Sequence, residues 1–136
     1  MDPNLVVDEE MEPDPELNEW TNKILACGFD VHSAIGPGFA ESIYQNALEH
    51  ELNLRGIPFQ RQVKVVVNYK GVVVGEGRID LIVNDRVIVE IKCVESISSV
   101  HVAQSIAYLR ATKLELCLVM NFNVKRLKDG IRRVAL

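Results

Sequence analysis

The fold is decided by the stretch Gly77-Arg78-Ile79-Asp80-Leu81-Ile82-Val83-Asn84-Asp85-Arg86-Val87-Ile88-Val89-Glu90-Ile91-Lys92. Two short runs rich in Ile and Val flank the turn signal at residues 84–86, and this pattern predicts a β-hairpin inside a sheet. Asp80 interrupts the first run, and Glu90 and Lys92 interrupt the second. Burying such charges is costly unless they are paired or bind a cation, so these three residues form the candidate functional site.

The length of the hairpin loop decides whether the two acids meet. A two-residue loop would pair Asp80 with Val89 and leave Asp80 and Glu90 on opposite faces of the sheet. A three-residue loop, residues 84–86, instead places Asp80 directly opposite Glu90. We predict the longer loop, or a bulge with the same effect.

The predicted arrangement suits a metal ion. Carboxylates that face each other on neighbouring strands lie about 5 Å apart at their Cβ atoms, close enough to share one divalent cation through oxygen ligands. Lys92 leaves the same face as Glu90, because the two are two residues apart on a strand. There it could hold a scissile phosphate or lower the pKa of an attacking water. The pattern of Asp80, then Glu-x-Lys on the partner strand, resembles the core of the PD-(D/E)XK nuclease superfamily.

A second stretch resembles one family of PD-(D/E)XK-like proteins. Residues 38–44, Gly-Phe-Ala-Glu-Ser-Ile-Tyr, match the Gly-x-x-Glu-x-x-Tyr signature for which the GxxExxY protein family is named. The resemblance spans roughly residues 17–136 and departs from the pattern before Arg78, where no aromatic residue stands. Its further segments are Leu54-Arg55-Gly56-Ile57-Pro58, Tyr69-Lys70-Gly71, Val89-Glu90-Ile91-Lys92, Val100-His101-x-x-Gln104, Asn121-Phe122 and Leu127-Lys128-Asp129-Gly130.

The resemblance implies an α/β fold with the restriction-endonuclease-like αβββαβ core, in which helices flank a central mixed sheet. It implies Mg²⁺ or Mn²⁺ as the cofactor, held by Asp80 and Glu90, with the backbone carbonyl of Ile91 and the carboxylate of Glu41 as further ligands. Glu41 also has an ordinary explanation, because a carboxylate in the first turn of a helix complements the helix dipole. Lys92 completes the set of catalytic residues that the resemblance implies.

Three further residues are expected near the site. His101, Gln104 and Tyr108 are spaced three and four apart and therefore form one polar stripe on a helix. In the superfamily a glutamine at this place lies near the active site, so Gln104 is expected to position water or phosphate. His101 and Tyr108 would contact substrate or support the site, although a solvated helix face explains the stripe equally well. Tyr44 would support Glu41.

The helical part of the pattern begins before the hairpin. Apolar residues at helical spacing predict an amphipathic helix over residues 16–35, and residues 36–38 break it before a second helix. In that second helix we expect Ile43 to face the core, while Tyr44 and Gln45 supply polarity.

The remaining elements follow from alternation and turn signals. Residues 60–69 alternate as a half-buried strand, and Gly75 and Gly77 indicate a bend or bulge where something approaches the backbone. A third helix runs over about residues 98–111, with a serine cap. Residues 114–120 then close the sheet as a buried strand, followed by a short C-terminal piece.

Charge is unevenly distributed along the 136 residues. We expect an acidic, disordered tail over residues 1–15 and one nuclease-like domain over residues 16–136. The first 16 residues hold seven acids and no Lys or Arg, whereas the rest carries 15 basic and 12 acidic residues. That balance permits a nucleic-acid partner without requiring one. The tail is either a solubilising extension or a phosphate mimic over the basic face. The cluster near the C-terminus is either a phosphate-binding surface or a solubilising edge; it consists of Lys125, Arg126, Lys128, Arg132 and Arg133.

The three cysteines, Cys27, Cys93 and Cys117, lie in apolar surroundings without C-x-x-C spacing, and we expect buried, reduced thiols. Three cysteines cannot supply the four ligands of an iron–sulfur cluster within one chain. No apolar run reaches the length of a membrane span, and the N-terminus lacks a signal-peptide pattern. An intracellular protein is therefore expected, in the cytoplasm or, in a eukaryote, the nucleus, with no membrane partner.

These observations favour a metal-dependent nuclease that hydrolyses phosphodiester bonds in nucleic acid, DNA rather than RNA. Two alternatives stay open. One is a catalytically silent nuclease fold that acts as a binding or partner subunit, since a small and weakly basic chain offers little surface for gripping a duplex. The other is a metal-dependent phosphoesterase acting on nucleotides. A homodimer or larger complex would suit the cutting of two strands.

Overall fold

The computed structural model of the protein describes residues 14–136, so the tail predicted over residues 1–15 lies outside the described part except for its last two residues. These two residues stand at the start of the first helix. Pro15 opens helix α1 (Pro15–Ile35), and Asp14 caps it by accepting a 2.7 Å hydrogen bond from the Leu17 amide. Proline suits the first helical position and aspartate the cap. The helix otherwise matches its prediction.

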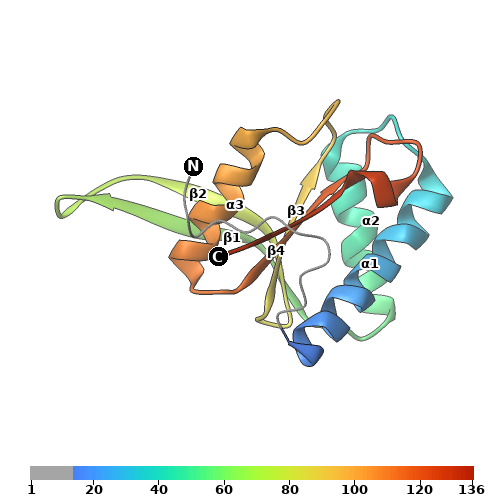
Figure 1. Cartoon of the computed structure of the whole chain (residues 1–136), viewed down its shortest axis with the longest axis horizontal. Helices are drawn as coiled ribbons and strands as arrows, with labels where there is room; N and C mark the ends of the chain where they lie inside the picture. Colours follow the sequence, from blue (N-terminus) through green and yellow to red (C-terminus); the bar gives the residue numbers. More distant parts are fainter. Residues whose placement is uncertain (1–13) are drawn as a thin grey trace.

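The other elements form an α/β fold, which confirms the predicted class (Figure 1). A mixed sheet of five strands has the order β1-β2-β3-β4-β5, and within it only β3 and β4 run parallel. The helix between these two strands provides the crossover that a parallel pair requires. The strands are β1 (Phe59–Tyr69), β2 (Val72–Val83), β3 (Val87–Lys92), β4 (Leu116–Asn121) and β5 (Ile131–Ala135), and the remaining helices are α2 (Glu41–Leu54), α3 (Ser99–Thr112) and the 3-10 helix η1 (Leu127–Gly130).

The C-terminal piece is itself a strand, which differs from the expectation that β4 closes the sheet. β5 pairs antiparallel with β4 and forms the edge beside it. All six residues of β4 are buried, because the strand has a neighbour on each side and helices over both faces. The bases Arg132 and Arg133 lie on β5 and not in a free tail.

Two apolar cores lie on the two faces of the sheet. The larger core joins α1 and α2 to one face through residues such as Leu17, Leu48 and Leu118. The smaller core joins α3 to the other face through residues such as Ile106 and Val119. Figure 1 shows the same layering, with α1 and α2 on one side of β3 and β4 and α3 on the other.

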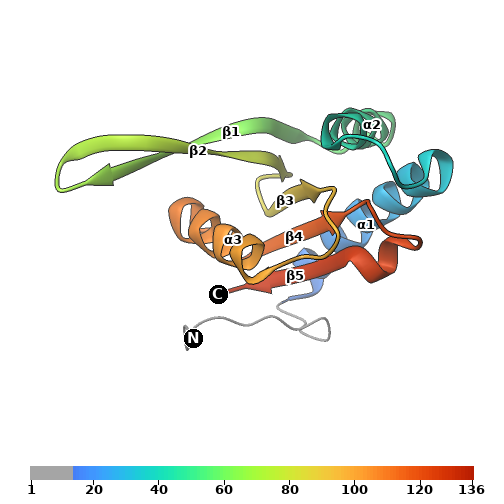
Figure 2. The ribbon, with the colours of Figure 1, turned by 90° about the horizontal axis from the view of Figure 1, so that it is seen from above.

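The β1–β2 hairpin extends beyond the body of the molecule, as Figure 2 shows. Its outer half carries exposed apolar side chains, namely Val66, Val67, Tyr69, Val72, Val73 and Val74. Val67 pairs with Gly75 and Asn68 with Val73, so one extra residue forms a bulge next to the predicted bend. A Cβ atom at Gly77 would lie 3.0 Å from the Tyr108 ring, which confirms that a group approaches the backbone there.

Helix α2 turns a different face inward than predicted. Ile43 is 41% exposed, whereas Tyr44 is fully buried and Gln45 is 8% exposed. The Tyr44 ring stacks on Phe122 with 4.8 Å between ring centroids, and its hydroxyl donates to the Gly36 carbonyl at 2.6 Å. It also accepts from the Phe39 amide at 3.1 Å. Tyr44 therefore holds the α1–α2 loop that leads into Glu41.

Replacing Tyr44 by phenylalanine should lower the free energy of unfolding by about 1 kcal/mol, because the stacked ring is kept while two backbone groups of the loop lose their partner. Tyr69→Phe is the matched control, since Tyr69 is 62% exposed at the hairpin tip, and it should change stability by less than about 0.5 kcal/mol. Urea unfolding followed by circular dichroism measures both. Equal losses for the two variants would contradict this role of the Tyr44 hydroxyl.

Candidate metal centre and active site

The hairpin between β2 and β3 has the three-residue loop that the sequence predicts. Val83 pairs with Val87 and Leu81 with Val89, which leaves residues 84–86 as the loop. Asn84 and Asp85 both adopt positive φ angles, 51° and 54°. This register brings Asp80 opposite Glu90, as expected.

The backbone pairing of β2 and β3 ends at Leu81 and Val89, and beyond it side chains replace the ladder. The Asp80 amide donates to Glu90 Oε2 at 2.8 Å. In return, the Ile91 amide donates to Asp80 Oδ2 at 2.8 Å. We call this reciprocal pair of bonds the carboxylate clasp. It holds both acids at the point where the two strands separate.

Strand β2 also turns over at Asp80, which means that its side chains exchange faces of the sheet there. Leu81 packs in the core under α1 and α2, but Ile79, two residues away, packs in the core under α3. Residues two apart on a regular strand share a face, so the strand twists sharply between them. On β1 the register pairs Arg61 with Leu81 and Val63 with Ile79, and the residue between, Gln62, has a positive φ of 49°.

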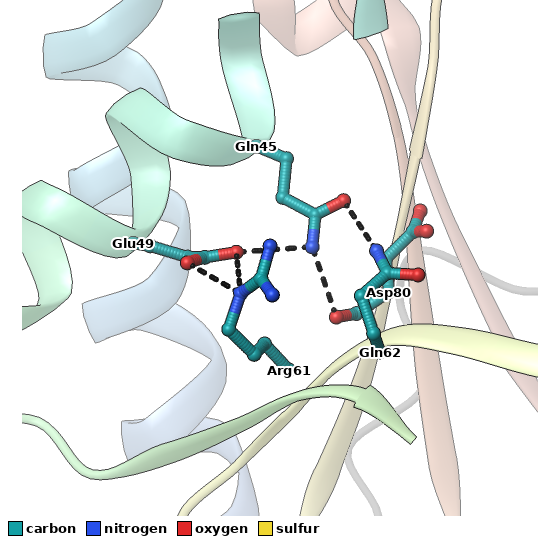
Figure 3. A network of polar contacts seen from close by, with 5 residues as sticks. All are labelled: Gln45, Glu49, Arg61, Gln62 and Asp80. Carbon is teal, nitrogen blue, oxygen red and sulfur yellow. Dashed lines mark hydrogen bonds and ion pairs between the residues drawn. The ribbon is translucent and has the colours of Figure 1, made fainter. Parts of the chain in front are cut away.

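A chain of amide groups fixes the Asp80 backbone from the other side (Figure 3). Gln45 points from α2 toward β2, where its Nε2 donates to the Asp80 carbonyl at 3.2 Å and to Glu49 at 3.0 Å. Gln62 Nε2 donates to Gln45 Oε1 at 3.0 Å. Arg61 closes the network by donating from Nε to Glu49 at 3.0 Å. The network thus joins α2, β1 and β2 around the candidate site.

Sequence reasoning missed Gln45 and Gln62 as parts of the site. Gln45 was placed only by its polarity on α2, and Gln62 only by alternation on β1. The one usable signal is spacing, because Gln45 follows Glu41 by four residues and therefore lies on the same face of the helix. Nothing in the local sequence indicates the left-handed backbone of Gln62.

Burial raises the pKa of both acids. Glu90 is 2% exposed, and burial, with the nearby Asp80 carboxylate second, raises the pKa of Glu90 to about 8. Burial also raises the pKa of Asp80, against the lowering effects of the Ile91 amide and the Lys92 ammonium. A divalent cation reverses this balance, since it attracts both carboxylates in their charged form. The donor set therefore fits such an ion.

Lys92 and Gln104 meet beside the two acids, a contact that the sequence did not predict. Lys92 Nζ donates to Gln104 Oε1 at 2.9 Å, so α3, which packs on the same face of the sheet, holds the end of the lysine side chain. The ammonium lowers the pKa of both Asp80 and Glu90 through its charge, and this places it in the same site. The arrangement thus combines two acids, one base and one amide at the C-terminal end of β3.

A comparison with models of protein families matches the family described as the PD-(D/E)XK nuclease superfamily over residues 18–134. The chain belongs to the PD-(D/E)XK nuclease superfamily. A search of curated proteins and a search of solved structures both found no match. The matched range includes every residue of the carboxylate clasp, together with Lys92 and Gln104. Members of the superfamily typically use divalent metals, in keeping with the donor set.

Glu41 lies at the margin of this superfamily site. Its carboxylate accepts a 3.2 Å hydrogen bond from the Cys93 amide, just after β3, and its charge raises the pKa of both Asp80 and Glu90. Within residues 14–136 no three Asp, Glu, His or Cys side chains lie close enough together to hold a metal ion. A divalent cation would therefore find a pair of carboxylates here, and an ion such as Mg²⁺ commonly completes its shell with waters and substrate phosphates.

The remaining predicted residues support the frame around the site. The Tyr108 hydroxyl accepts from the Arg78 amide at 3.3 Å and donates to the Arg78 carbonyl at 3.1 Å, which fixes β2 two residues before Asp80. His101 Nδ1 accepts from the Ser98 amide at 3.0 Å and so caps α3. Tyr44 binds the loop before Glu41, through Gly36 and Phe39, and not the Glu41 carboxylate.

Two further expectations concern the rest of the described chain. All three cysteines are free thiols. Cys27 and Cys117 are buried, as predicted, whereas Cys93 is only half-buried. Across residues 14–136, none of the helices combines the length and apolar character needed to cross a membrane.

The metal-free protein should lose stability as the pH rises from about 4.5 to about 8. Glu90 binds its proton more tightly in the folded than in the unfolded chain, so the folded state is favoured at low pH and this advantage disappears as Glu90 ionises. Over this window the loss should be on the order of a few kcal/mol, and Asp80 acts in the same direction.

Glu90→Gln should flatten this slope, because glutamine keeps the shape of the protonated acid without titrating. Urea unfolding in EDTA between pH 5 and pH 9 measures it, with Glu95→Gln as the control at an exposed position. A parent protein whose stability stays level or rises over the window, relative to Glu90→Gln, would contradict the raised pKa of Glu90.

Proposed function

We propose that this protein is a metal-dependent nuclease of the GxxExxY family, which hydrolyses phosphodiester bonds in nucleic acid, with DNA as the expected substrate. The observation that carries the proposal is the carboxylate clasp, with Lys92 held by Gln104 beside it. A buried glutamate beside a half-buried aspartate, with a lysine next to them, suits the joint binding of a cation and a phosphate.

In the proposed site, Asp80 and Glu90 would hold Mg²⁺ or Mn²⁺, with the Ile91 carbonyl and Glu41 as further candidates. When bound, the ion would supply Lewis-acid activation of water and of the phosphate. The residues of the chain perform the remaining tasks. The Lys92 ammonium neutralises charge that develops on the phosphate oxygens during in-line attack by water. Gln104 keeps that ammonium in position through its 2.9 Å hydrogen bond.

The frame around the site serves the same reaction by restricting movement. The amide network fixes the Asp80 backbone from α2 and β1, and Tyr108 fixes Arg78, two residues before Asp80, from α3. A site held by three separate elements presents its carboxylates in a constant position, which is what transition-state stabilisation requires.

A catalytically silent subunit with the same fold is the second candidate function. It is favoured by the clasp itself, because each carboxylate already accepts a backbone hydrogen bond without any metal. In that case the acids would serve as a structural lock between β2 and β3, and the protein would bind nucleic acid or a partner without cleaving it.

Cleavage by the purified protein separates these candidates. We expect Mg²⁺- or Mn²⁺-dependent cutting of labelled DNA, reduced at least about 100-fold by Asp80→Asn, Glu90→Gln or Lys92→Met. Glu95→Gln, at an exposed position after β3, is the matched control and should act like the parent. Circular dichroism verifies that each variant is folded.

Three other outcomes of the cleavage assay would each change the assignment. A parent protein that binds metal and DNA but cuts neither DNA nor RNA would favour the silent subunit. A Lys92→Met variant as active as the parent would remove the role assigned to Lys92. Inhibition by mononucleotides that is stronger than inhibition by long DNA would indicate a phosphoesterase acting on nucleotides.

A further inference from the structure

We propose that a basic hollow beside the α1–α2 loop binds the phosphate backbone of the nucleic-acid substrate at a distance from the cleaved bond. The hollow has a volume of about 520 Å³ and lies between α1 and the segment that follows β4. Phe29, Gly36, Lys125, Arg126 and Lys128 are among its lining residues. This inference rests on the nuclease function proposed above and extends it to a second contact with the substrate.

The charge of the hollow favours an anion. Lys125, Arg126 and Lys128 are all exposed. Within residues 14–136, the ion pair between this group and an acid is the 3.6 Å contact of Arg126 with Asp129. A second hollow of about 340 Å³ shares Phe29 and Lys128 with the first and adds Arg133. Together the two hollows form a basic surface beside α1.

A larger hollow nearby does not share this character. It has a volume of about 590 Å³, and its lining mixes the acids Asp14 and Glu19 with the bases Lys23 and Arg55. A polyanion gains little on a surface of mixed charge. Charge therefore selects the basic hollow of about 520 Å³ as the binding surface, although size alone would select the one of about 590 Å³.

The basic hollow and the candidate site lie at the same end of strands β3 and β4. Lys92 ends β3 and Asn121 ends β4, and the two residues pair with each other. The Phe122 amide then donates to the Lys92 carbonyl at 2.9 Å. The segment that carries Lys125 and Lys128 thus begins beside the residue that we place on the scissile phosphate.

The α1–α2 loop joins the two regions from the other side. Its first residues, Gly36 and Pro37, line the hollow, and it leads into Glu41, which contacts the end of β3. His32 Nε2 lies 2.8 Å from the Val124 carbonyl and so fixes the basic segment to α1. Figure 1 shows this segment and the loop side by side at the end of β3 and β4.

A nucleic-acid backbone matches this surface better than an acidic peptide does. The flexible ammonium groups of Lys125 and Lys128 act as point charges for successive phosphates. Phe29 is 40% exposed at the shared wall of the two hollows, where its ring can stack on a base. A strand that leaves the site past Glu41 would reach both features.

The test is DNA binding by Lys125→Glu/Lys128→Glu, measured by fluorescence anisotropy in EDTA at several salt concentrations. We expect binding at least 10-fold weaker than for the parent, and a slope of log affinity against log salt that is smaller by about 1.4 to 1.8, for two lost phosphate contacts. The matched control, Lys70→Glu/Lys113→Glu, changes two exposed lysines elsewhere by the same charge and should lose less than 3-fold. Equal losses for both pairs, or no loss for either, would overturn the inference.

Cleavage kinetics separate this inference from the proposed function. If both hold, the Lys125→Glu/Lys128→Glu variant raises the KM for long DNA and keeps the maximal rate at saturating DNA. Binding that depends on these lysines in a parent protein without cleavage would support the hollow and refute the nuclease. Cleavage by the parent with an unchanged KM in the variant would refute the hollow and support the nuclease. Thermal unfolding verifies that the variants are folded.

Discussion

The structure depends on the exchange of hydrogen bonds between two carboxylates and the backbone of the opposite strand. Asp80 accepts from the Ile91 amide and Glu90 from the Asp80 amide, both at 2.8 Å. These bonds satisfy amides that the ladder no longer pairs, which is why β2 and β3 can separate and β2 can turn over at this point. They also hold the buried Glu90 next to the half-buried Asp80 at a cost, which the raised pKa of Glu90 reflects. A bound cation would offset that cost, which links the fold to the proposed chemistry.

Much of the sheet could be predicted from residue patterns. The apolar runs around residues 84–86 predicted the hairpin of β2 and β3, and the pairing of Asp80 with Glu90 favoured the three-residue loop that the structure contains. The faces of α2 could not be predicted in the same way. Ile43 is exposed and Tyr44 is buried, because Tyr44 finds a ring to stack on and two backbone partners in distant segments. Tertiary contacts thus outweigh the hydrophobicity of single residues.

The candidate site was predictable to the extent that it lies on regular strands. Asp80, Glu90 and Lys92 follow from alternation and loop length, and Gln104 from the family resemblance. Gln45 and Gln62 were missed, because their roles depend on the turnover of β2 and on a positive φ at Gln62. Glutamine has no particular preference for that conformation, so only the assembled network of α2, β1 and β2 accounts for it.

The most direct test of this account is isothermal titration of Mn²⁺ into the parent protein and into an Asp80→Ala/Glu90→Ala double variant, with circular dichroism on both. The account predicts that the parent binds Mn²⁺ and releases protons near neutral pH, since Glu90 must ionise to become a ligand. The folded double variant should show no such binding. Equal binding by both proteins, or no binding by the folded parent with or without nucleic acid, would contradict the view that the carboxylate clasp is a metal site.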